Sequence, residues 1–158
     1  MTGEPIMTER DLAAAARTII DANQYMTLAT ADALGQPWAS PVFYATADYA
    51  EFYWISVPEA THSRNLAQRP QIAMVIFDST APEGTGQAVY MSAAAEQVPD
   101  GDLDQALARY PGPVPAPYQL YRATAFEHSI LCPREGGGAC TPHGVLFDHR
   151  VPVRLVAG

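Results

Sequence analysis

The chain has 158 residues, of which 48% are hydrophobic and 16% charged, a composition typical of one globular domain. Nine basic residues stand against 17 acidic ones, the net charge is -8, and all nine basic residues are arginines. The lack of lysine excludes Schiff-base and P-loop lysine chemistry, and the acidic balance argues against a nucleic-acid partner.

The sequence also bears on the compartment. It contains no apolar run long enough to span a membrane. Residues 1–10 have neither the basic flank nor the apolar centre of a secretion signal, and two cysteines are too few for a disulfide framework. We therefore expect a soluble, cytoplasmic, bacterial protein with no membrane partner.

The N-terminal part of the chain predicts a loose tail over residues 1–7 and a single domain over residues 8–158. A helix is expected to begin at Thr8, because Thr8 and Asp11 have the spacing of a capping box. Asn23 is a suitable stop. Apolar residues recur between them at helical spacing, namely Leu12, Ala15, Ala16, Ile19 and Ile20.

The remainder of the chain predicts mainly strands. They are expected over residues 25–30, 38–45, 51–57, 71–78, 87–98 and 123–131, with a last short strand at 144–147. Residues 71–78 are almost continuously apolar, which is typical of a strand covered on both faces. Short helices are expected over 61–69 and 101–110. Consecutive antiparallel strands with one crossover helix indicate a small barrel with peripheral helices.

The segment between the third strand and the helix that follows it has the composition of a phosphate site. A helix N-terminus offers unpaired N–H groups and a partial positive charge. His62 and Arg64 add donors, and Ser56, Thr61 and Ser63 add hydroxyl groups. The alternative is a helix capped by Thr61 or Ser63 with Arg64 as a solvated surface charge.

Three segments in order resemble the flavin-binding split-barrel family that includes pyridoxamine 5′-phosphate oxidase. They are residues 25–44 with their central turn, residues 51–70 with the His62-Ser63-Arg64-Asn65-Leu66 run, and residues 86–93. The resemblance covers roughly residues 8–98. It implies a mainly β fold, a six- to seven-stranded antiparallel split β-barrel with peripheral helices.

The resemblance also implies a cofactor and an assembly. The cofactor is flavin mononucleotide (FMN), held in two equivalent sites at the interface of a homodimer. Ser40, Pro41 and Val42 would lie along the isoalloxazine edge, and Gln87 would reach the ring or the phosphate. His62, Ser63 and Arg64 would anchor the cofactor phosphate, with the hydroxyl groups of Ser56 and Thr61 as further ligands. Flavins carry hydride chemistry themselves, so no catalytic side chain is assigned.

Two positions depart from the family pattern. Ala39 or Ser40 stands where the oxidases carry a basic residue, and His62 stands where many members carry lysine. These changes leave fewer permanent charges for a phosphate, which keeps the deazaflavin F420 as an alternative cofactor. The C-terminal residues 147–155 do not match the basic motif that recognises pyridoxal phosphate, so we do not expect a vitamin B6 substrate.

The function predicted from the sequence is therefore a flavin-dependent oxidoreductase that transfers hydride or electrons to an unknown small molecule. The first alternative is a non-catalytic barrel that binds or senses flavin or haem, suggested by the weaker charge at position 62. Another is an F420-dependent reductase, and a further one is a structural dimer without a ligand.

A second group of residues invites a metal hypothesis. His128, Cys132, Cys140 and His143 have the residue types of a zinc site with two cysteines and two histidines. Their spacing matches no compact metal motif, so we predict no metal site. A disulfide between Cys132 and Cys140 is compatible with the loop length but is not expected in a reducing cytoplasm.

Overall fold

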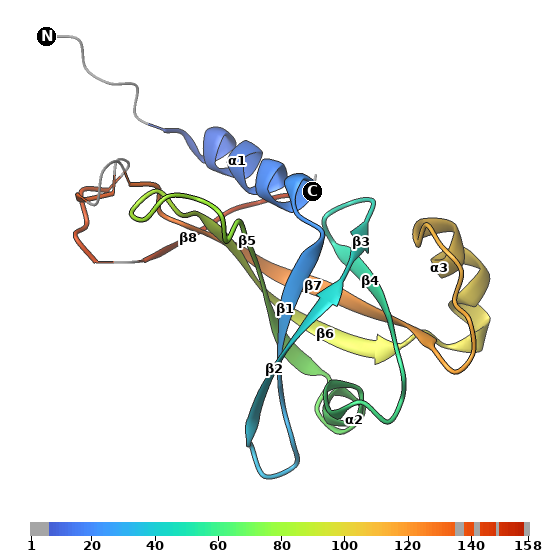
Figure 1. Cartoon of the computed structure of the whole chain (residues 1–158). Helices are drawn as coiled ribbons and strands as arrows, with labels where there is room; N and C mark the ends of the chain where they lie inside the picture. Colours follow the sequence, from blue (N-terminus) through green and yellow to red (C-terminus); the bar gives the residue numbers. More distant parts are fainter. Residues whose placement is uncertain (1–6, 135–137, 141–142, 148, 157–158) are drawn as a thin grey trace, which may run out of the picture.

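The computed structural model describes residues 7–134, 138–140, 143–147 and 149–156 (Figure 1). The predicted tail lies outside the described residues except for Met7, which packs half-buried against the core. The helices are α1 (Glu9–Ala22), α2 (Thr61–Gln68) and α3 (Leu103–Arg109), the last preceded by the 3-10 turn η1 (Asp100–Asp102). The strands are β1 (Tyr25–Ala31), β2 (Pro37–Phe43), β3 (Ala45–Thr46), β4 (Glu51–Ser56), β5 (Gln71–Phe77), β6 (Ala88–Gln97), β7 (Gln119–Leu131) and β8 (Arg150–Pro152).

All strands belong to one antiparallel sheet with the order β2-β1-β5-β6-β7-β4-β3, and β8 pairs with the free side of β7. The sheet curls so that β2 and β4 approach each other without forming a ladder. Helices α1 and α2 lie toward opposite ends of this curved sheet (Figure 1). The predicted mainly β split barrel with peripheral helices is thus confirmed.

Local sequence explains why α1 begins where it does. The Thr8 backbone N–H donates to Asp11 Oδ2 at 2.8 Å, and the Asp11 N–H donates to Thr8 Oγ1 at 3.2 Å. This reciprocal pair is the predicted capping box, and Asn23 is the C-cap. The apolar stripe of α1 then faces the barrel, with Ile20 fully buried.

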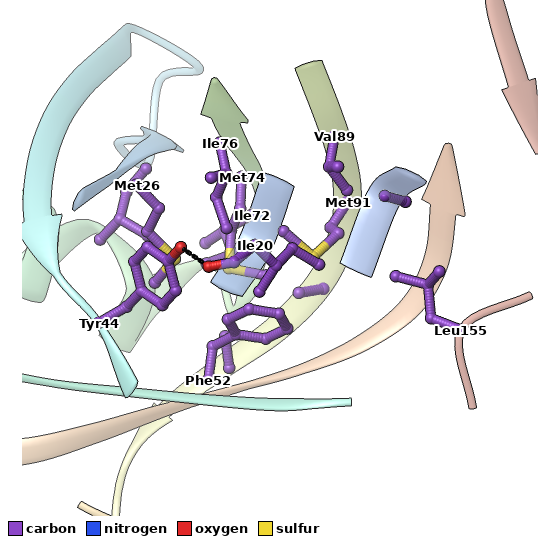
Figure 2. Packing of buried hydrophobic residues seen from close by; sticks show 14 of the residues in the cluster. Ile20, Met26, Tyr44, Phe52, Ile72, Met74, Ile76, Val89, Met91 and Leu155 are labelled. Carbon is purple, nitrogen blue, oxygen red and sulfur yellow. Dashed lines mark hydrogen bonds between the residues drawn. The ribbon is translucent and has the colours of Figure 1, made fainter. Parts of the chain in front are cut away.

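The barrel interior is filled by methionine, isoleucine and aromatic side chains from β1, β4, β5 and β6 (Figure 2). The Tyr44 hydroxyl lies within hydrogen-bond distance of the carbonyl oxygens of Ile20 and Asn23, and it ties the end of α1 to the chain after β2. A smaller cluster under α3 contains Tyr53, Val98, Ala106, Tyr110 and Leu120. The packed interior leaves ligand binding to the outer surfaces.

Two predictions about strands were wrong. Residues 71–78 were expected to be covered on both faces, but side chains along β5 alternate between buried and uncovered. Three of the four outward residues, Ala73, Val75 and Phe77, are apolar as well, which hides the period of two in the sequence. The last strand is also displaced: residues 144–147 form no strand, and the pairing with β7 is made by β8, at Arg150–Pro152. In the described residues, seven strands, among them the two-residue β3, follow one another across the sheet, and the short β8 pairs at the side of β7.

Candidate functional site

The candidate site is built where β2, β4 and the start of α2 meet. His62 Nε2 lies 2.8 Å from Ser56 Oγ, and His62 Nδ1 lies 3.2 Å from Ser40 Oγ. Ser40 points inward from β2, and Ser56 is the last residue of β4. The imidazole therefore bridges two strands that share no ladder, and it fixes the first turn of α2 between them.

Burial determines the charge of this imidazole. Desolvation lowers the pKa of His62 below its ordinary value, so the neutral form predominates at neutral pH. A neutral ring has one N–H donor and one acceptor nitrogen, and the two hydroxyl groups can satisfy both. His62 acts on this evidence as a neutral brace of the site.

The N-terminus of α2 lacks a side-chain cap, because its N-cap residue is Ala60. The first-turn N–H groups, which begin at Thr61, thus have no capping oxygen. Ser63 Oγ, on a residue 3% exposed, makes no hydrogen bond to any residue that the structure describes. Ser63 and the exposed Arg64 line a cavity of about 450 Å³ beside the end of β6. Donors without partners are thus concentrated at one helix end.

Two contacts that the sequence did not single out hold α2 in place. Asn65 Nδ2 donates to Thr30 Oγ1 at 3.1 Å, between two buried residues, and Arg69 Nη2 donates to the carbonyl oxygen of Ala33 at 2.9 Å. Asn65 is part of the run that carries the family resemblance, which was the only signal available for it. These two contacts fix the orientation of α2 relative to the β1–β2 hairpin.

The outer face of the sheet forms a second feature. The outward side chains of β1, β2 and β5 are Tyr25, Thr27, Ala29, Ala31, Pro37, Ala39, Pro41, Phe43, Gln71, Ala73, Val75 and Phe77, and none of them is charged. We call this set the outer face. Tyr25, Phe43 and Phe77 are 61%, 45% and 48% exposed, and the first two rings pack edge to face at 5.8 Å.

A cavity of about 260 Å³ continues the outer face toward β6 and β7. Its lining includes Ala73, Val75 and Tyr90, and the guanidinium of Arg150 lies 3.7 Å from the centre of the Tyr90 ring. This is the geometry of a cation–π contact. With Glu127, Arg150 introduces charge at the border of an otherwise neutral surface.

The structure brings together some of the predicted site residues and separates others. Ser40 lies beside His62, whereas Pro41 points to the outer face and Val42 into the core. Gln87 precedes β6, whose ten residues extend about 33 Å, and the far end of β6 lies beside α2. Gln87 and His62 of one chain therefore do not face a common phosphate.

The cysteines lie in another region, beyond the end of β7. Cys132, Cys140, His143 and His149 offer ligand atoms that all lie within 4.8 Å of one another. His149 completes this group in place of His128. His128 lies elsewhere, with its Nε2 2.7 Å from the Tyr49 carbonyl oxygen. Burial raises the pKa of the Cys132 thiol to about 12.

Comparison with known proteins supports the family resemblance. A family model described as pyridoxamine 5′-phosphate oxidase matches residues 12–132. No curated protein sequence matches the chain.

No helix in the described part of the chain is long and apolar enough to cross a membrane.

Several solved structures share the fold. A haem-binding protein from Mycobacterium smegmatis superposes with a TM-score of 0.67 at 22% identity, covering 89% of this chain and 57% of that one, so this chain spans just over half of its length. An FAD-binding protein from Mesorhizobium loti gives 0.62 at 23% identity, covering 75% of this chain and 92% of its own. The haem storage protein HutZ from Vibrio cholerae gives 0.55 at 19% identity, covering 79% and 92%.

The family model covers both strands and the helix that build the His62 site, as well as the whole outer face. The uncapped helix after β4 lies inside the same match. The chain belongs to the pyridoxamine 5′-phosphate oxidase family.

Proposed function

We propose that this chain is a flavin-dependent oxidoreductase that binds the phosphate of FMN at the N-terminus of α2 and works as a homodimer. The observation that carries the proposal is the concentration of unused donors there. Ala60 supplies no capping oxygen, and the buried Ser63 hydroxyl has no partner among the described residues. A phosphate would satisfy the N–H groups and the hydroxyl together.

The residues present fit a phosphate without lysine. The exposed Arg64 guanidinium can form a planar, two-pronged contact with phosphate oxygens. Thr61 provides a further hydroxyl on the first turn. His62, held between Ser40 and Ser56, keeps the helix end at a fixed distance from β2. The positive charge of the site thus comes from one arginine and the helix end.

When bound, the flavin would supply the hydride or electron transfer, and the chain's residues would bind, orient and shield it. In this proposal Ser40, Pro41 and Val42 present the backbone of β2 to the ring. A second copy of the chain could pack against the uncharged outer face and would then shield that face from water. Gln87 lies far from α2 in its own chain, so its predicted contact is compatible only with a site completed by two chains.

The homodimer is inferred from the outer face. Large aromatic groups and small apolar residues occupy three adjacent strands there, and contiguous apolar surface of this kind marks an interaction site in soluble proteins. The apolar composition on both sides of β5 agrees with a strand that a second copy would cover. A homodimer fits because a symmetric interface requires one self-complementary surface.

Haem is less well supported, although two of the similar proteins are haem proteins. An axial histidine must offer a free nitrogen lone pair to iron. Both ring nitrogens of His62 already have serine hydroxyl partners, so the histidine of the candidate site has no free lone pair for iron. The candidate site therefore supports a flavin better than a haem.

The test compares FMN with riboflavin, which lacks the phosphate, by titration followed by flavin fluorescence. We expect the protein to prefer FMN, and Arg64→Ala to weaken FMN binding roughly 10- to 100-fold while riboflavin binding is unchanged. Arg10→Ala, on the exposed side of α1, is the matched control.

Absence of binding to FMN would exclude the proposed cofactor, and binding of F420 in its place would assign the deazaflavin alternative. Equal affinity of wild type and the Arg64 variant for FMN would refute the phosphate site. Turnover of a reduced nicotinamide with an electron acceptor would support the oxidoreductase. A tightly bound flavin without turnover would identify a binding or sensing barrel.

A further inference from the structure

The loop that joins β7 to β8 carries a group of side chains that the proposed function does not use. Cys132 follows the last residue of β7 and His149 precedes the first residue of β8. Cys140 and His143 come from the turn between them. These four residues, which we call the Cys2His2 cluster, place one ligand atom each within 4.8 Å of all the others.

We propose that the Cys2His2 cluster is a structural zinc site. The distances fit this ion. With Zn–S near 2.3 Å and Zn–N near 2.0 Å, neighbouring ligand atoms of a tetrahedral site lie about 3.3 to 3.8 Å apart. Cys132 Sγ lies 3.3 Å from His143 Nδ1, and Cys140 Sγ lies 3.8 Å from His149 Nδ1. The T-shaped arrangement of the two imidazoles, with centroids 5.4 Å apart, lets both rings converge on one point.

Backbone contacts fix three of the four ligands directly. The β7–β8 ladder pairs Leu131 with Arg150, and the Cys132 N–H donates to the His149 carbonyl oxygen at 2.9 Å, which places these two ligands side by side. Cys140 exchanges backbone hydrogen bonds with Val145 and Gly144, at 2.9 and 2.7 Å. These two bonds hold Cys140 beside the residues that directly follow His143.

The surroundings of Cys140 are those of a metal thiolate. The Val145 N–H donates to Cys140 Sγ at 3.4 Å, and such second-shell donors orient a ligand sulfur. Gly144 takes a φ of 66° in this turn, a conformation natural to glycine, and a side chain there would strain the turn. Both sulfur atoms are shielded from solvent, as the cysteines are 2% and 1% exposed.

Zinc suits this ligand set for chemical reasons. Two thiolates and two imidazoles are the preferred ligands of Zn²⁺, and two thiolates would neutralise its charge in a buried position. Four protein ligands leave no open coordination position, which is typical of a structural site and not of a catalytic one. The ion would hold the β7–β8 connection closed and so keep Arg150 over Tyr90 beside the outer face.

The experiment measures metal binding directly in the full chain. Protein purified under reducing conditions from zinc-supplemented medium is analysed by native mass spectrometry and elemental analysis. We expect zinc equimolar with protein. Replacement by Co²⁺ should give the thiolate charge-transfer band and the intense visible bands of tetrahedral cobalt. A thermal shift on chelation should show that the folded state binds the ion.

Variants separate the cluster from adventitious binding. Cys132→Ser with Cys140→Ser should abolish zinc binding. His149→Asn should weaken zinc binding by more than the factor of about 10 to 100 that is typical of second-shell changes. His149 is half-exposed, so the fold should tolerate its replacement better than that of the buried cysteines. His128→Asn is the matched control, because His128 lies outside the cluster, and it should retain the metal.

Three outcomes would overturn the proposal. The reduced wild-type protein could take up neither Zn²⁺ nor Co²⁺, or bound cobalt could lack the thiolate band. Alternatively, intact mass could show that Cys132 and Cys140 form a disulfide and lose both thiol hydrogens even in reducing medium. Each of these results leaves flavin binding untouched, so the zinc site and the proposed function are judged separately.

Discussion

Ser63→Ala is the most informative single change in the candidate site, because it should alter stability and binding in opposite directions. The Ser63 hydroxyl is buried and has no hydrogen-bond partner among the residues that the structure describes. An unsatisfied buried polar group costs about 1 to 3 kcal/mol, and alanine is also a slightly better helix former than serine. Without cofactor, the variant should therefore be about 1 to 3 kcal/mol more stable.

For a domain of this size, 1 kcal/mol shifts the melting temperature by about 2 to 4 °C. Calorimetry of the cofactor-free protein should therefore show a rise in melting temperature of about 2 to 12 °C. Thr18→Ala, at an exposed position of α1, is the control for helix propensity and should raise the free energy of unfolding by no more than about 0.7 kcal/mol.

The same substitution should weaken FMN binding about tenfold, because the hydroxyl would no longer reach the phosphate. Riboflavin affinity should be unchanged. A variant that is less stable without cofactor would show that the hydroxyl is satisfied in solution. A variant that gains stability and still binds FMN as tightly as wild type would refute its role as a phosphate ligand.

Three further predictions concern charge and assembly. Burial lowers the pKa of His62 in the folded state, so the stability that neutral His62 contributes is complete above about pH 6.5 and is lost as pH falls through the folded pKa. His62→Gln should therefore reduce the loss of stability at acid pH in urea titrations, and an unchanged loss would contradict the prediction. Arg122→Ala should lower the free energy of unfolding by about 1 kcal/mol, and by less at high salt, because it breaks ion pairs with two half-exposed carboxylates. Replacement of the more exposed Arg109 should have a smaller effect, and a loss that does not depend on salt would indicate packing as the cause. Ala73→Arg places a charge within the outer face and should convert a dimer to a folded monomer in sedimentation experiments, whereas a monomeric wild type would argue against the dimer.

Local signals in the sequence were sufficient for most elements. The capping box of α1 and the hairpin of β1 and β2 depend on residues close in the chain, and both were found as predicted. The family resemblance correctly indicated the fold, because three segments in order constrain the topology more than any one does. Local periodicity failed at β5, where an apolar row on the uncovered face made two rows resemble one continuous buried run.

Composition by itself established that phosphate binding in this chain cannot depend on lysine, and the order of motifs directed attention to the start of α2. Only the tertiary structure showed that His62 bridges Ser40 and Ser56, that the Ser63 hydroxyl has no hydrogen-bond partner among the described residues, and that His149 joins the two cysteines. The physical reason is the distance along the chain. Ser40 and His62 are 22 residues apart, and their contact depends on how the sheet curls, which no local pattern encodes.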